Sequence, residues 1–331
     1  MKERSSGIKH EVWQRFSRLA SAREAIIFGV TIGLFVLFTF LSGGKFISAD
    51  VVSILAISAA ELGIVALGVA MLMTCGEFDL SVGSVTAVGS IIAATLYQLG
   101  LNPFLALAIA VGGGVVAGAI NGLVVVKFGI PSFITTLGTM MVWRGLVSVV
   151  TKGYTIIFRV VDTHPAFHNI LQGGMGVVPA PLLWFVVMII VLMLLLNFHR
   201  FGNHVFATGG NKEAARAMGI NTNKTKVACF MIVGGLAAFS GVMQLVRIRG
   251  FQALQGTGME LMAIGAVVIG GTSLFGGTGT IIGAALGVLI VTFLQFGLIM
   301  AGVAGFWYKL VLGVLIIAVV AMNTVVERRR K

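Results

Sequence analysis

Residues 51–74 read VVSILAISAAELGIVALGVAMLMT, and Glu61 is the one charged side chain among them. A helix needs about 20 predominantly apolar residues to cross the hydrocarbon core of a bilayer. The run is long enough to do so, and it therefore predicts a membrane-spanning helix. It also raises the question of why a carboxylate lies near its middle.

The rest of the chain has the same character. The 331 residues are 58% hydrophobic and 10% charged, with a mean hydropathy of +1.04. A soluble globular domain is typically about 25% charged, so this composition excludes an ordinary soluble enzyme. A transmembrane β-barrel would show repeated alternating segments of about 10 residues, which are missing. The composition indicates an all-α polytopic integral membrane protein.

The apolar runs divide the chain into about ten predicted transmembrane helices. The segment over 259–271 is too short to span the bilayer without help from its neighbours. The predicted segments are 25–42, 51–74, 81–99, 104–126, 133–150, 182–197, 227–245, 259–271, 281–299 and 307–326.

The basic residues predict the orientation of these helices. With both termini on the cytoplasmic side, sixteen Lys and Arg residues fall inside and six fall outside. This is the bias expected from the positive-inside rule, so the basic pI of about 10.3 reflects topology and not nucleic-acid binding. The long 198–226 loop is then cytoplasmic, and the 151–181 loop faces outward.

The chain ends extend this division. Residues 1–24 combine basic and apolar side chains at near-helical spacing, which predicts a cytoplasmic amphipathic segment lying on membrane lipid; a frayed basic tail is the alternative. Residues 25–326 form one transmembrane domain, and 327–331 form a basic cytoplasmic tail. Cys75 and Cys229 lie in or beside apolar runs and suggest no disulfide framework.

The 198–226 loop contains the most specific motif of the sequence, GGNKEAARAMGI at residues 209–220. Asn211 is a good N-cap, and Glu213 falls in the first turn, where the helix dipole favours a negative charge. Gly219 supplies a left-handed stop. The motif predicts a two-turn helix, which is too short to be stable alone in water and must pack against something.

This motif resembles the coupling segment of permease subunits in ribose-type sugar ABC importers. Further elements resemble the same family: GEFDLSVGS at 76–84, FITTLGTMMVWRGL at 133–146 and GMELMAIGAVVIGGTSLFGGTG at 258–279. Phe78 stands where isoleucine is commoner, and Gln295-Phe296 stands where ribose members often carry two asparagines. The resemblance implies that the helix contacts a cytoplasmic ATPase, through Gly210, Asn211, Glu213, Ala214, Ala215 and Gly219.

The resemblance also implies the function and the partners. The chain would be the permease subunit of a bacterial inner-membrane importer for a sugar or related polyhydroxylated ligand. It would work with a second permease chain, identical or not, a periplasmic binding protein, and an ATPase that holds ATP and Mg²⁺. No P-loop pattern GxxxxGK[ST] occurs in this chain, so it is not expected to hydrolyse ATP or bind a cofactor itself.

Other classes of function are weighed against this one. A secondary, ion-coupled transporter or a channel could use Glu61 or Asp79 as a proton or ion site. An intramembrane enzyme or metal site would need a ligand cluster, and the five histidines show no HExxH spacing.

Charged and aromatic residues within the spans are the candidates for the substrate pathway. An ionisable side chain inside a bilayer costs roughly 2.5–3.5 kcal/mol on insertion scales, so Glu61 and Arg144 each need a reason. They either line the pathway or form an ion pair with each other, and we hypothesise that pair. Trp143 shares a helix face with Thr136 and could stack on a sugar, although ordinary packing explains this face as well. Gln295 is a further candidate.

The segment CGEFDLSVGS, residues 75–84, is interpreted as a turn at the inner water boundary. Asp79 precedes Leu80, Ser81 and Val82 and is predicted to N-cap the next helix, so that neither it nor Glu77 needs a buried partner. A structural hairpin accounts for this pattern. The alternative is that Phe78, Asp79 and Ser81 belong to an inner gate.

Overall fold

Helices follow the apolar runs of the sequence. The structure is a computed structural model that describes residues 22–175 and 178–330, so the predicted amphipathic segment lies almost entirely outside the described residues. Each of the ten predicted segments coincides with a helix to within five residues at either end. These helices are α2 Ala22–Leu41, α3 Ala49–Thr74, α4 Val82–Gln98, α5 Pro103–Phe128, α6 Ser132–Thr151, α9 Ala180–Asn197, α12 Thr222–Ile248, α13 Met259–Ile269, α14 Ile281–Met300 and α15 Trp307–Arg330.

Seven of these helices are long and apolar enough to cross a membrane, and α4, α13 and the apolar part of α15 are shorter. The all-α fold class is confirmed, while the number of spans and the orientation stay predictions. The remaining elements are short and lie in the connections. They are η1 Lys45–Ile47, β1 Ile156–Ile157, α7 Val160–Thr163, α8 Pro165–Leu171, β2 Gly174–Met175, β3 Val178–Pro179, α10 Arg200–Gly210, α11 Lys212–Ala217 and β4 Gly250–Phe251.

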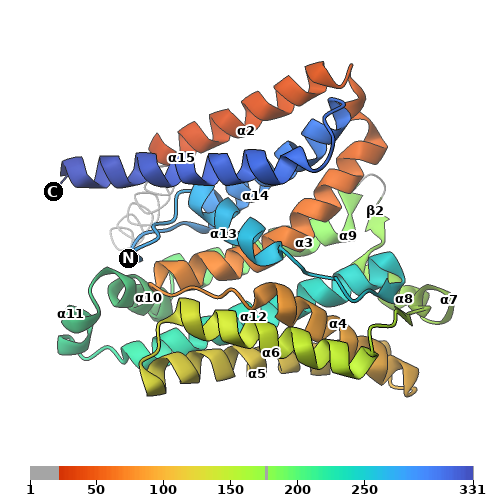
Figure 1. The fold of residues 1–331 in the computed structure, drawn as a ribbon, viewed down its shortest axis with the longest axis horizontal. Coiled ribbons are helices and arrows are strands. Elements are labelled where there is room, and N and C mark those ends of the chain that lie inside the picture. Colours follow the sequence, from red (N-terminus) through yellow and green to blue (C-terminus); the bar gives the residue numbers. More distant parts are fainter. Residues whose placement is uncertain (1–21, 176–177, 331) are drawn as a thin grey trace, which may run out of the picture.

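The two ends of the bundle differ. Figure 1 shows α10 and α11 at the same end as the start of α2 and the end of α15. The opposite end carries α7, α8 and the antiparallel pairs β1–β4 and β2–β3. The two loops that the sequence predicts to lie on opposite sides, 198–226 and 151–181, are therefore at opposite ends of the bundle.

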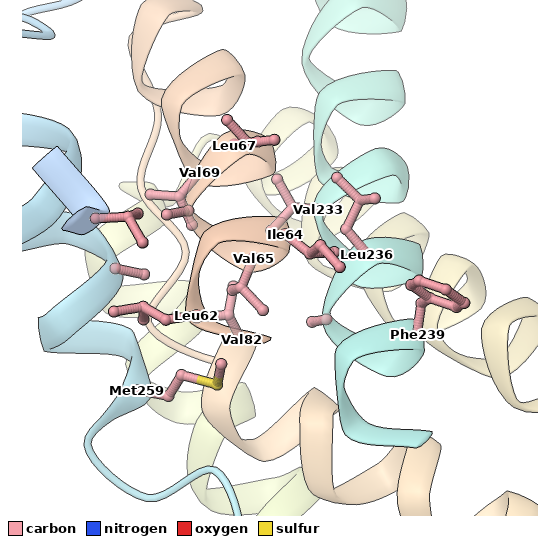
Figure 2. Close-up of a cluster of buried hydrophobic side chains, with 14 of the residues drawn as sticks. Leu62, Ile64, Val65, Leu67, Val69, Val82, Val233, Leu236, Phe239 and Met259 are labelled. Carbon is pink, nitrogen blue, oxygen red and sulfur yellow. The ribbon is translucent and has the colours of Figure 1, made fainter. Parts of the chain in front are cut away.

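The core of the bundle lies around α3 and α12, whose apolar windows are 78% and 83% buried. Figure 2 shows their side chains meeting, with Ile64 of α3 near Val233 and Leu236 of α12. On its other side α12 packs against α5 through small residues. A Cβ at Gly118 of α5 would collide with the carbonyl of Phe230. Close approach of this kind replaces the hydrophobic drive that is missing between helices in lipid.

The chain between α3 and α4, segment 75–81, enters the bundle without forming a helix or a strand, and it has turns at 75–76 and 80–81. The Leu80 N–H donates to Thr136 Oγ1 at 3.0 Å, and Ser84 Oγ donates to the Met140 carbonyl at 2.9 Å. Met140 is eight residues from the first residue of α6, which is about 12 Å at 1.5 Å per residue. The predicted turn is present at Cys75 and Gly76, beside Gly209 of α10, but helix α4 starts farther inside the bundle than that turn.

A second interrupted segment approaches the same place from the other end. The chain between β4 and α13 runs from the end of α12 back to the middle of the bundle (Figure 1). Gly83 at the start of α4 and Gly256 before α13 are so close that a Cβ on either would collide with the backbone of the other. Irregular backbone at this depth is tolerated only where protein or water satisfies it. The two starts therefore need polar partners.

Candidate polar site within the bundle

Glu61 is buried in α3 and forms a bidentate ion pair with Arg247 of α12. Arg247 Nε lies 2.7 Å from Oε1, and its Nη2 lies 2.8 Å from Oε2. Gln172, from the turn after α8, donates to Oε1 at 3.3 Å and to the Met243 carbonyl at 2.7 Å. The hypothesis that Glu61 pairs with Arg144 is wrong, because Arg247 occupies both carboxylate oxygens.

Arg144 has a different partner set. Its guanidinium donates to the carbonyls of Gln255 at 2.8 Å and of Ala253 and Gly83 at 3.3 Å. Glu260, in the first turn of α13, attracts it electrostatically. The planar fork of arginine suits several fixed acceptors at once. Arg144 therefore links α6 to the starts of both α4 and α13. It donates hydrogen bonds to backbone carbonyls at these starts.

A polar cavity of about 300 Å³ lies beside the Glu61–Arg247 pair. Ligand pockets in proteins range from about 300 to 1,000 Å³, so it is large enough for a small molecule. Glu61 and Gln295, both predicted from the sequence, line it; Arg144, Trp143, Phe78, Asp79 and Ser81 do not. Its walls are Ser58, Glu61, Leu62, Gln244, Arg247, Gly256, Thr257, Met259, Met262, Thr292, Gln295 and Phe296.

Asp79, in segment 75–81, is buried, with 1% of its surface exposed. Its Oδ1 accepts from the Ser81 N–H at 2.7 Å and from Ser81 Oγ at 2.6 Å, and its Oδ2 accepts from Asn121 Nδ2 of α5 at 3.2 Å. Ser81 is the residue that precedes α4, but its side chain makes no capping hydrogen bond. Asp79 accepts the Ser81 N–H, which is the contact predicted for a helix cap, although Asp79 lies two residues ahead of the cap position. The carboxylate also links segment 75–81 to α5 through its hydrogen bond with Asn121.

Glu77 is also buried, at 7% exposed, and it pairs with Lys226 in the second turn of α12. The expectation that the two carboxylates of this stretch need no buried partner is therefore wrong for both. A charge removed from water is tolerated only when it is paired and hydrogen-bonded. Segment 75–81 is held by one carboxylate near each of its ends.

Trp143 and Phe78 are half-buried and make no contact with the polar cavity. The inward face of α6 contacts segment 75–81 and α4. The Phe78 N–H donates to Ser132 Oγ at 3.1 Å, and Ser84 Oγ donates to the Met140 carbonyl. Among the described residues Trp143 Nε1 is buried without a hydrogen-bond partner. Within this stripe Thr136 Oγ1 is used by the chain itself, since it accepts from the Leu80 N–H, whereas a pathway role for Trp143 stays a prediction.

The short helix predicted in the 198–226 loop is confirmed as α11. Asn211 Oδ1 accepts from the N–H groups of Glu213 at 3.1 Å and Ala214 at 2.9 Å. Gly219 has φ 83°, and the Ile220 N–H bonds the Ala215 carbonyl at 3.0 Å, which is a Schellman stop. Ala215 is buried against the chain itself, whereas Glu213 and Ala214 are exposed.

Several residues of the polar site were not identified from the sequence. Arg247 counted only as an outer basic charge, and Gln172 and Asn121 carried no pattern at all. Helix α10, which holds Gly210 at its end, was treated as a loop, because three of its eleven residues are glycines. Partners contributed by distant helices leave no local signal in one sequence.

Comparisons with known proteins find similar permeases over most of the chain. A ribose import permease protein of Escherichia coli strain K12 is 35% identical, over 78% of this chain and 81% of its own. An inner membrane ABC transporter permease protein of the same strain is 35% identical, over 89% and 90%. An autoinducer 2 import system permease protein of Salmonella typhi is 31% identical, over 87% and 82%.

No solved structure matches the chain significantly. The relatives and the apolar helices together indicate a multi-pass protein of the bacterial inner membrane. A family model covers residues 51–320, which include the polar cavity, both interrupted segments and α11. The chain therefore belongs to the family described as branched-chain amino acid transport system / permease component.

Proposed function

We propose that this chain is the permease subunit of an ABC importer for a sugar or a related small hydroxylated molecule. The observation that carries the proposal is α11, a capped two-turn helix that lies at one end of the bundle with Glu213, Ala214 and Met218 exposed. A helix this short gains stability by packing, and its outward face is free to fit a partner. We assign that face to a cytoplasmic ATPase, which supplies ATP and Mg²⁺.

The substrate class follows from the polar cavity. Its walls combine hydroxyl, amide and carboxylate groups with one guanidinium, through Ser58, Gln244, Thr292 and Gln295 beside the Glu61–Arg247 pair. Such mixed donors and acceptors suit a ligand rich in hydroxyl groups. The names of the ribose and autoinducer 2 permeases support the same choice.

Two copies of the permease, or this chain and a similar one, would enclose the pathway, and a periplasmic binding protein would deliver the ligand. An ion-coupled carrier is the competing function, and it would need Glu61 or Asp79 free to take up a cation. Both carboxylates already hold donors from their own chain, Arg247 and Asn121 among them. This favours the ATP-driven mechanism.

Reconstituted vesicles test the proposal. We expect uptake of ligand only when the ATPase subunit, ATP and the loaded binding protein are all present. Uptake that follows an imposed proton or sodium gradient, without ATP, would refute the importer and favour the ion-coupled carrier.

Replacing Gly219 with valine is expected to abolish ATP-driven uptake while the bundle stays folded. The left-handed conformation at φ 83° costs a β-branched residue about 1–2 kcal/mol, so α11 loses its sharp end. Uptake and ATPase stimulation are measured in vesicles. Gly153→Val, at φ 78° in the opposite loop, is the matched control and should keep coupling. Normal uptake by the Gly219 variant would contradict the role of α11.

The variant Gln295→Ala tests the cavity. Losing one hydrogen bond to the ligand removes about 1 kcal/mol, which is about a fivefold fall in the uptake rate. Exposed Gln252→Ala serves as the control, because Gln252 lies outside the cavity walls. Equal uptake rates for the two variants would remove Gln295 from the pathway.

A further inference from the structure

A second cavity, of about 170 Å³, lies between α11 and the ends of α5, α6 and α12. It is not part of the polar site inside the bundle. Three of its side chains are cationic and one is anionic. The wall consists of Glu77, Val125, Val126, Gly129, Ile130, Pro131, Lys212, Arg216, Asn223 and Lys226.

The positive charge of this pocket is only partly compensated. Lys226 is neutralised by Glu77, and the side chains of both are about nine-tenths buried. Arg216 uses Nε on Thr222 Oγ1 at 2.9 Å and Nη2 on Asn223 Oδ1 at 3.0 Å, which are both neutral groups. In the part of the chain that the structure describes, neither Lys212 nor Arg216 has a carboxylate within ion-pair distance.

Mutual repulsion within the pocket is visible at Lys212. The charge of Lys226, together with partial burial and the charge of Arg216, lowers the pKa of Lys212 from its ordinary value. A bound anion would relieve this repulsion, since it would lie among three cations and one carboxylate. The pocket is therefore electrostatically suited to a negative ligand.

The two free cations are on the inner side of α11. Lys212, Ala215 and Arg216 share one helix face at i, i+3 and i+4, and Ala215 on that face is only 4% exposed. Lys212 and Arg216 flank the buried Ala215 and stay exposed to the pocket opening, and Met218 at the end of α11 is 83% exposed.

The apolar half of the wall indicates which anion enters. Val125, Val126, Ile130 and Pro131 lie where α5 ends and α6 begins, beside the exposed rings of Phe128 and Phe133. A surface of this kind is in contact with lipid where a helix leaves the membrane. The ligand should therefore carry a phosphate and an apolar body together, which describes a phospholipid better than a soluble anion.

We propose that this pocket binds the phosphate headgroup of an anionic phospholipid, held by Lys212 and Arg216 with Lys226 behind them. Basic pockets at the cytoplasmic side of membrane helices bind such headgroups. The bound lipid would join α11 to the ends of α5 and α6. The inference does not depend on the transported substrate or on the ATPase.

Lipid retention by the purified full-length chain tests the proposal. Native mass spectrometry would count bound phosphatidylglycerol or phosphatidylcholine for the wild type and for Lys212→Gln/Arg216→Gln. Each cation near a headgroup contributes a factor of about five, so the double variant should bind phosphatidylglycerol about 25-fold more weakly. The control Lys127→Gln/Lys224→Gln removes two exposed charges at the same end, outside the pocket, and should change binding less than twofold.

Three results would overturn the proposal. The first is equal loss of phosphatidylglycerol in the control, which would mean a diffuse surface effect. The second is thermal stabilisation of the wild type by inorganic phosphate, lost in the pocket variant, with no retained lipid; the ligand would then be a soluble anion. The third is weaker binding of the ATPase to the pocket variant with unchanged lipid retention, which would assign the pocket to an acidic protein segment.

Discussion

Replacing Arg247 with alanine is expected to lower the free energy of unfolding by about 3 kcal/mol and to abolish transport. Removing one partner of a buried ion pair typically costs 3–5 kcal/mol, because the other charge stays buried and uncompensated. Glu61 would keep only Gln172 as a donor. We take the low end of the range because the Arg247 side chain is 43% exposed, so water can replace part of it.

Thermal unfolding of the detergent-solubilised protein measures this effect. Arg159→Ala is the matched control, since Arg159 is exposed at the same end of the bundle, and it should unfold like the wild type. The double variant Glu61→Gln/Arg247→Gln removes both charges and should recover much of the lost stability. If the Arg247 variant unfolds like the Arg159 control, the pair is not stabilising.

The two variants also separate folding from transport. Glu61→Gln/Arg247→Gln keeps hydrogen-bonding groups in the wall of the polar cavity and removes both charges from it. A folded double variant without uptake would show that the charges act on the ligand or on the opening of the pathway. A folded double variant with normal uptake would restrict the pair to a structural role.

Hydrophobic runs predicted the helices because burial in lipid and length determine them locally. Helix α11 was also predicted from local signals, because its N-cap Asn211 and its left-handed Gly219 lie close together in the sequence. Glu61 and Gln295 were each named as pathway candidates because of their residue types within spans, and both line one cavity, while their role in a pathway stays a prediction. What the sequence indicated, in each case, was a property of a segment or of one residue.

Pairing between segments could not be predicted in this way. Glu61 meets Arg247 across 186 positions, and Asp79 meets Asn121 across 42. The mistaken pairing with Arg144 assumed that two charges within spans must neutralise each other. Arg144 instead serves backbone carbonyls of interrupted segments, and nothing in the hydropathy pattern shows that α4 and α13 start inside the bundle.

Segment 75–81 shows most clearly which contacts the sequence could not predict. Between the apolar runs, CGEFDLSVGS reads as a polar turn at the membrane surface, and Asp79 reads as a helix cap. Residues of α6 and α5 supply the hydrogen bonds that draw this segment inward. Since those donors and acceptors lie more than 40 positions away, only the folded chain shows that Asp79 is buried.

The largest expected effect of a single-atom change is that of Asp79→Asn, which should destabilise the protein by about 2–3 kcal/mol. A surface cap would tolerate asparagine, but here the side chain accepts three hydrogen bonds, two from Ser81 and one from Asn121. Asparagine has one acceptor oxygen, so its amide would face the amide of Asn121. Hydrogen bonds to charged groups contribute about 1.5–3 kcal/mol each, and an unsatisfied buried donor adds to the loss.

The reciprocal exchange Asp79→Asn/Asn121→Asp is the decisive comparison, because it keeps one carboxylate and one amide in the same space. We expect it to recover at least half of the stability that Asp79→Asn loses in thermal unfolding. Asn102→Asp, at an exposed helix cap on α5, adds the same charge outside the network and should give no recovery when combined with Asp79→Asn. If the exchange is no more stable than Asp79→Asn alone, the pair does not fasten the segment. If it is stable yet fails to transport, Asp79 acts in the movement of segment 75–81 and not only in holding it.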